Sequence, residues 1–356
     1  MAQAGSSQPE RKRPRLSPED EDEDEKPFVN HATLYFDDGN AILAAGRMLF
    51  CVHRSLLSKH SIVLRDLFEE SHARFRGLLH LEMEETSEEV EALLNVIYDG
   101  LRVDVQKLSV ETFPSLANIL RMAAKYQVER PCEDILARIR AEWPAILAQH
   151  DVKEIEFSAR LTRIYGGANM PPGIRHPAQA HPPPEPIPQE EDVIVHPASV
   201  IALLRECGYH DRDLLFPLFY ALSCTTWQFG GPILGHNLAP LSSADVERLV
   251  VGIERLRSAH ISSALVLPEF TASPTQPPHF CTLGATQLWT TMLHLLLPKT
   301  QHQSRPMEDW RNMIPVVTAQ HMQHHVCALC ARAIAAKIET IRQRLWASLP
   351  AYFELS

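Results

Sequence analysis

Residues 49–68, with the sequence LFCVHRSLLSKHSIVLRDLF, constrain the fold of this chain more than any other segment. They are predicted to begin as a β-strand and to continue as two short, closely spaced helices. His53 and Arg54 lie where the strand passes into the first helix. The apolar anchors of the segment are Phe50, Leu56, Leu57, Ile62, Leu64 and Phe68. A strand followed at once by helices indicates a sheet that packs against helices.

Flanking patterns extend this prediction on both sides. Strands are expected at 33–36, 41–44, 48–52 and 78–83, and helices at 54–58 and 62–70. Asp38-Gly39 is a hairpin turn signal, which predicts that the first two strands form a hairpin. Thr86 and Glu89 form a capping box that starts a helix ending at Asp99-Gly100. This order of elements predicts an α+β fold, a small sheet covered by a helical cluster.

The rest of the chain is predicted to be all-α, apart from one break. Eight prolines fall within residues 171–188, which predicts an extended linker because proline fixes φ and lacks an amide donor. Ser242 and Asp245 are expected to cap a helix that runs through Leu256. The other predicted helical segments are a pair within 110–126, then 135–168, 199–207, 214–224, 283–297 and 321–349.

The N-terminal tail is polar and carries charge in blocks, so it is predicted to be disordered. Residues 19–25 are seven consecutive acids, which account for seven of the ten excess negative charges. The near-neutral remainder argues against a broad nucleic-acid-binding face. Arg11, Lys12, Arg13 and Arg15 form a basic cluster typical of nuclear import signals, although such clusters are common in disordered tails. Nuclear or cytoplasmic localisation, or both, is expected.

Composition narrows the class of protein further. The seven cysteines are odd in number and mostly far apart, which predicts reduced thiols inside a cell rather than a disulfide framework. The polar N-terminus lacks the apolar region of a signal peptide. No apolar run approaches the roughly 18 residues that a membrane span requires. Neither a membrane nor nucleic acid is therefore expected among the partners.

Residues 28–127 resemble a BTB/POZ domain. The family pattern is Phe-x-x-His, a basic residue, two aliphatics, a Ser and an aromatic residue seven positions later. The matching residues, named the signature residues below, are Phe50, His53, Arg54, Leu57, Ser61 and Phe68. Residues 35–40 and 52–58 look most like the fungal, basidiomycete-like branch of the family. The segment 327–330, with Trp346 and Phe353 after it, is similar to the tail of the same group.

Composition, motifs and this resemblance together predict an organisation and a function. The predicted parts are a tail (1–27), a BTB/POZ domain (28–130), a helical extension (131–168), a Pro-rich linker (169–192) and a helical C-terminal domain (193–356). The implied function is a non-enzymatic protein–protein interaction module that acts as a regulatory scaffold or co-regulator. The alternatives are a Cullin-3 ubiquitin-ligase substrate adaptor and a zinc-stabilised structural protein.

The chain departs from the family pattern at two places. Dimeric members often place an Asp in the first strand, buried against the Arg of the signature, and His31 is expected to occupy that position here. An Arg without its carboxylate would leave an uncompensated buried charge, which argues against the usual homodimer. Cullin-3 adaptors often carry an apolar-x-Glu motif before the fourth strand, and residues 71–77 contain none. This absence disfavours the adaptor.

Only one segment resembles a metal site. Cys327 and Cys330 form a Cys-x-x-Cys pair, and His324 could add a third zinc ligand, with His279 or Cys281 joining from a distant loop. The alternative is that both cysteines lie on the buried face of a helix. The sequence contains no phosphate loop, Gly-x-Ser-x-Gly or His-Glu-x-x-His motif, so neither catalysis nor a cofactor is predicted.

Overall fold

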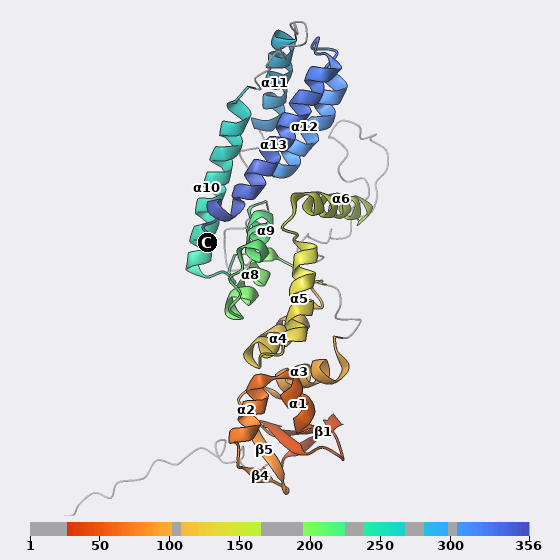
Figure 1. The fold of residues 1–356 in the computed structure, drawn as a ribbon, viewed down its shortest axis with the longest axis vertical. Helices are drawn as coiled ribbons and strands as arrows, with labels where there is room; N and C mark the ends of the chain where they lie inside the picture. Colours follow the sequence, from red (N-terminus) through yellow and green to blue (C-terminus); the bar gives the residue numbers. More distant parts are fainter. Residues whose placement is uncertain are drawn as a thin grey trace, which may run out of the picture. The chain divides into compact units, whose positions relative to one another are not determined.

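The computed structural model describes residues 27–101, 108–164, 195–224, 238–267, 281–297 and 305–355. The chain divides into two compact units, Met1–Ile97 and Tyr98–Ser356. Figure 1 labels their helices and strands. The import-signal residues Arg11, Lys12, Arg13 and Arg15 and the predicted linker 169–192 lie outside the described residues. Within the described part of the chain, no helix has the length and apolar character that crossing a membrane requires.

The first unit contains a five-stranded mixed sheet and three helices (Figure 1). Its strands are β1 (Val29–Tyr35), β2 (Ala41–Ala45), β3 (Met48–Val52), β4 (Arg74–Phe75) and β5 (Leu78–Met83). Its helices are α1 (Arg54–His60), α2 (Ile62–Glu70) and α3 (Ser87–Asp99), of which the last extends across the boundary between the units. The order of strands in the sheet is β1-β3-β2-β5-β4. The predicted succession of a strand and two helices over residues 49–68 is therefore present.

The predicted hairpin between the first two strands is wrong. β1 pairs in parallel with β3, whereas β2 pairs antiparallel with β3 and parallel with β5. The tight hairpin joins β2 to β3 instead, at Gly46, whose φ of 55° suits glycine. The Asp38-Gly39 turn leads the chain from one side of β3 to the other. A turn signal marks a change of direction, but it does not specify which strands become neighbours.

Gly39 is required at this turn because the backbone passes very close to β3. A Cβ atom at residue 39 would lie 2.5 Å from Cys51 Sγ and 2.9 Å from the Cys51 carbonyl carbon. The flanking N–H groups of Phe36 and Asn40 donate to the carbonyl oxygens of Cys51 and Val52, at 2.9 and 3.0 Å. The turn is thus hydrogen-bonded to β3 on both sides of Gly39.

The two edges of the sheet approach each other. β1 and β4 lie at opposite ends of the strand order, yet the rings of Phe28 and Phe75 are 5.4 Å apart, edge to face. Arg76 Nη1 donates to Asn30 Oδ1 at 3.0 Å and to the Tyr35 hydroxyl at 3.1 Å. Between the edges lies a small apolar cluster of Ile42, Ala44, Leu49 and Cys51, with Tyr35, Phe75 and Leu78 packed against it. The curled sheet therefore buries residues on both of its faces, and every residue of β2 is buried.

The second unit is helical in its described residues. Its helices are α4 (Phe113–Lys125), α5 (Glu129–Glu142), α6 (Leu147–Ile164), α8 (Pro197–Glu206), α9 (Arg212–Ser223), α10 (Ser243–Leu265), α11 (Thr282–Leu296), α12 (Pro306–Gln320) and α13 (Ala328–Tyr352). The largest side chains of its core are Phe219, Tyr220, Trp289, Trp310 and Phe353, all fully buried. The prediction of an α+β part followed by a helical region is confirmed, whereas the predicted domain boundaries stay predictions.

Local signals placed several helix starts correctly. The Asp245 N–H donates to Ser242 Oγ at 3.1 Å, and the capping box of Thr86 and Glu89 closes with bonds of 3.0 and 3.3 Å. Residues 113–125 form one helix rather than the predicted pair, and α10 continues to Leu265. The helix predicted over 321–349 begins only at Ala328, after a turn.

The helix α12 was not predicted from the sequence as a separate element. Pro306 and Pro315 interrupt the apolar pattern of this segment and normally signal a break. Pro306 lies in the first turn, where a missing amide costs nothing, and the buried contacts of Met307, Trp310 and Val317 stabilise the helix despite Pro315.

Candidate functional site

Most of the signature residues belong to the core of the first unit. Phe50 of β3, Leu57 of α1 and Phe68 of α2 are all buried. Ser61 is also buried, and its Oγ accepts the Leu64 N–H at 2.9 Å, which caps the start of α2. These buried residues shape the junction between the strand and the two helices. They cannot contact a partner directly, so they influence binding only by positioning the exposed residues around them.

His53 and Arg54 lie at the more accessible end of this junction. His53 Nε2 is 3.2 Å from Asp38 Oδ1, and its ring centroid is 5.2 Å from that of Phe36. The backbone N–H of Arg54 donates to Asn40 Oδ1 at 2.8 Å, while Arg54 itself is exposed. Both residues therefore connect the start of α1 to the turn at residues 36–40.

His31 has partners of its own within the first unit. Its ring stacks on Phe50 with centroids 4.8 Å apart, and its Nδ1 accepts the Leu34 N–H at 3.1 Å. Nε2 lies 3.5 Å from Glu91 Oε2 of α3. Arg54 is exposed in the single chain, so it is not a buried charge there, and the expectation about the homodimer stays a prediction.

β1 presents an open edge in this unit. Among the strands that the structure describes, β3 is its one neighbour; at its start Val29 is 55% exposed, and Phe28 is 47% exposed although its ring packs on Phe75. An edge strand offers unpaired N–H and C=O groups to another chain, and exposed apolar side chains add contact area. This edge is the candidate surface for a protein partner.

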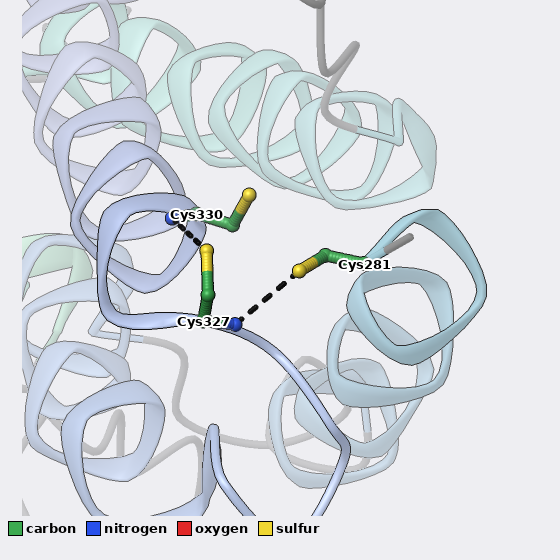
Figure 2. A group of neighbouring side chains, drawn as sticks. All are labelled: Cys281, Cys327 and Cys330. Carbon is green, nitrogen blue, oxygen red and sulfur yellow. Dashed lines mark hydrogen bonds between the residues drawn. The ribbon is translucent and has the colours of Figure 1, made fainter. Parts of the chain in front are cut away.

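Three cysteines converge in the second unit, as Figure 2 shows. The sulfur atoms of Cys281, Cys327 and Cys330 all lie within 4.8 Å of one another. Cys281 immediately precedes α11, Cys327 immediately precedes α13, and Cys330 lies in the first turn of α13. Cys281 and Cys330 are buried, and Cys327 is partly exposed. This group is named the cysteine cluster below.

Backbone amides donate to two of these sulfurs. The Cys330 N–H donates to Cys327 Sγ at 3.5 Å, and the Cys327 N–H donates to Cys281 Sγ at 3.3 Å. The pKa of Cys327 is lowered to about 6, first by the Cys330 N–H and further by the neighbouring thiols. Burial and, after it, the adjacent cysteines together raise the pKa of Cys330 to about 12. Of Cys327 and Cys330, Cys327 therefore ionises at the lower pH.

The cysteine cluster differs from the ligand set predicted for zinc. Cys327 and Cys330 are present in it, but Cys281 takes the third place, and His324 is not a member among the described residues. The backbone of His324 instead lies against the first turn of α11, near Gly284. His279 falls outside the described residues.

A second group of titratable residues is buried among α6, α9 and α12. His150 Nε2 lies 2.8 Å from Glu308 Oε1, and the Tyr220 hydroxyl donates to Glu308 Oε2 at 2.8 Å. Glu154 is nearby and forms an ion pair with Arg305 at 3.2 Å. This group could not be predicted from the sequence because its members lie up to 158 residues apart. The side chains of this group already hydrogen-bond to one another. The group therefore links the helices α6, α9 and α12.

The family comparison bears directly on the first unit. Residues 36–139 match the BTB/POZ domain. The matched segment contains all six signature residues and extends into α5. No curated protein and no solved structure matches the chain. The match is to the BTB/POZ domain in general, so it gives no support to a fungal branch.

The BTB/POZ match indicates a class of function for the matched segment, which begins after β1. BTB/POZ domains are generally interaction modules rather than enzymes, and they often form dimers. The predicted protein–protein interaction module is supported at this level. The signature residues that build the fold could be predicted from the sequence. The exposed edge of β1 could not, because its exposure depends on which strands pair with each other.

Proposed function

We propose that this chain is a non-enzymatic scaffold or co-regulator in which the BTB/POZ domain pairs with a second copy. The helical unit then carries the specificity for other partners. The observation that supports this proposal most directly is the match of residues 36–139 to a domain of interaction modules. Cytosolic or nuclear partners of the helical unit would be recognised by surface complementarity, with an apolar centre and a polar rim.

The open edge of β1 favours a second copy as the partner. Strand addition at a free edge uses backbone hydrogen bonds, which an identical strand can supply in return. The exposed Phe28 and Val29 give the same surface an apolar component. Arg54 is exposed in the single chain, and His31 pairs with Glu91 of α3, so a second copy could approach without a charge already buried at this place.

Light scattering of the full chain over a range of concentrations tests this proposal. The wild type is expected to approach the mass of a dimer, and Val29→Lys is expected to weaken dimerisation at least about tenfold, because a charge would be placed in the apolar contact. Val152→Lys is the matched control, since Val152 of α6 is also 55% exposed. It should leave the dimer unchanged.

A wild type that remains monomeric at every concentration would refute self-pairing. In that case the same samples would be titrated with Cullin-3. Binding at micromolar concentration would identify the chain as a ligase adaptor, and no binding would leave one-to-one partners of the helical unit.

We also propose that the basic cluster Arg11, Lys12, Arg13 and Arg15 directs the chain to the nucleus. Replacing all four by Ala in a fluorescent fusion is expected to shift the protein to the cytoplasm. An unchanged nuclear fraction would refute the signal.

A further inference from the structure

We propose that Cys281, Cys327 and Cys330 bind one zinc ion that fixes the start of α11 to the start of α13. The three thiols lie together although Cys281 and Cys327 are 46 residues apart in the chain. Thiolates are preferred zinc ligands, and a Cys-x-x-Cys pair places two of them within reach of one ion, to which Cys281 adds a third from another segment.

The separation of the sulfur atoms suits a zinc ion. Zinc–sulfur bonds are about 2.3 Å long, which places two sulfurs of a tetrahedral site about 3.8 Å apart. The three sulfurs here already lie within 4.8 Å of one another. Movements of about 1 Å, within reach of cysteine rotamer adjustment, would therefore complete the geometry. Figure 2 shows Cys281 facing Cys327 across the gap between the two helix starts, with Cys330 beside Cys327.

The surroundings of the sulfurs suit the charge of the complex. One zinc ion with three thiolates carries a net charge of −1. The Cys330 and Cys327 N–H groups already donate to cluster sulfurs, and the amino-terminal ends of two helices, α11 and α13, begin at these cysteines. Such donors orient ligands and stabilise negative charge. On binding, each thiol that still carries a proton would release it to solvent.

Close backbone packing holds the two helix starts together. A Cβ atom at Gly284 would lie 1.9 Å from the carbonyl oxygen of His324, so only glycine permits this contact. The turn before Cys327 is itself closed, because the Val326 N–H donates to the His321 carbonyl at 2.8 Å and His321 Nδ1 lies 2.8 Å from the Val326 carbonyl oxygen. The proximity of the three cysteines is therefore built into the fold.

The fourth ligand is expected to come from solvent. Cys281 and Cys330 are buried, whereas Cys327 is partly exposed, so water can reach the ion beside Cys327. A site with three protein ligands keeps one exchangeable position. The ion would add a cross-link between distant segments and would thereby stabilise the helical unit against unfolding.

Metal analysis of the full chain tests this proposal. Wild-type protein is incubated with zinc under reducing conditions, desalted and analysed by atomic emission. About one zinc per chain is expected. Cys327→Ser and Cys281→Ser should each reduce the content at least fivefold. Cys207→Ser is the matched control because Cys207 lies outside the cluster and is also partly exposed. His324→Ala should keep its zinc, since His324 is not a cluster member.

Circular dichroism checks that each variant is folded. A second readout, which needs no substitution, is the thermal midpoint of the wild type with and without a chelator. Removal of zinc from the wild type should lower its thermal midpoint, and the Cys207→Ser protein should respond equally. Wild-type protein that retains no zinc would overturn the proposal. So would zinc that persists in Cys281→Ser but is lost in His324→Ala. Formation of a disulfide within the cluster in the presence of zinc would overturn it too.

Discussion

Glu308 shows how a single buried charge is accommodated in this protein. It lies in α12 and is only 7% exposed. Its two carboxylate oxygens are engaged by His150 and by the Tyr220 hydroxyl, and the Met307 N–H donates in turn to the Tyr220 oxygen at 3.1 Å. A buried carboxylate without such partners would be strongly destabilising. The stability of the helical unit should therefore depend on the ionisation of Glu308.

Burial alone would raise the pKa of Glu308, but the hydrogen bond and charge of His150 and the hydroxyl of Tyr220 lower it overall. A carboxyl whose folded pKa lies below its unfolded value of about 4.3 contributes stability above that pH and loses it as the pH falls through the folded pKa. Glu308→Gln should therefore destabilise the protein near pH 7 by about 1–3 kcal/mol.

The decisive comparison is the pH dependence. Urea unfolding followed by tryptophan fluorescence should show a steeper loss of stability from pH 5 to pH 3 for the wild type than for Glu308→Gln. Glu247→Gln, at an exposed position of α10, should retain the wild-type slope. Parallel pH profiles for the wild type and Glu308→Gln would contradict this assignment.

At the scale of elements, helix starts are set by short-range hydrogen bonds. Ser61 lies between α1 and α2, in extended backbone conformation, and its Oγ accepts the Leu64 N–H. The same device starts α10 at Ser242. Capping fixes where α2 begins, and thereby how the signature residues of the two helices face the sheet.

Ser61→Ala is expected to destabilise the BTB/POZ domain by about 1–2 kcal/mol, because the cap is lost and the buried Leu64 N–H is left without its acceptor. Hydrogen exchange of peptides from residues 50–70 measures this effect, since all five tryptophans follow residue 98. Ser55→Ala, on the exposed side of α1, is the control and should change exchange little. Equal protection in both variants would show that the cap is unimportant.

At the scale of the whole molecule, long-range ion pairs join distant segments of the helical unit. Arg342 of α13 is 2% exposed and donates to the Met307 carbonyl of α12 at 2.9 Å. It also pairs with Glu339 on its own helix and with Asp151 of α6, 191 residues away. Arg311 of α12 binds the same carboxylate of Asp151 at 3.1 Å. Three helices therefore depend on one guanidinium group.

Arg342→Met is expected to lower the free energy of unfolding by about 3 kcal/mol, because the Met307 carbonyl and Asp151 lose a buried donor. Urea unfolding followed by tryptophan fluorescence reports on this unit, which contains every tryptophan of the chain. Arg332→Met, at an exposed position of α13, should cost less than about 0.5 kcal/mol. A loss in Arg342→Met no larger than this control would refute the role of Arg342.

The sequence alone determined the local features of this protein. The strand and two helices of residues 49–68, the capping box at Thr86 and the cap at Ser242 follow from periodicity and side-chain chemistry within a few residues. The α+β class and the BTB/POZ resemblance rested on the same short-range patterns, and the family match supports them. Such features can be predicted because the hydrogen bonds of a helix start and the apolar periodicity of a helix or strand involve residues only a few positions apart.

Only the tertiary structure decided which distant groups meet. It paired β1 with β3 rather than β2, placed Cys281 rather than His324 beside Cys327 and Cys330, and brought His150 and Tyr220 onto Glu308. The sequence made Cys281 one of several candidate zinc ligands. Nothing in the sequence distinguished it from the other candidates, His324 and His279. Contacts between distant segments arise from the packing of whole helices and sheets, and the pattern within one segment carries no record of its neighbours.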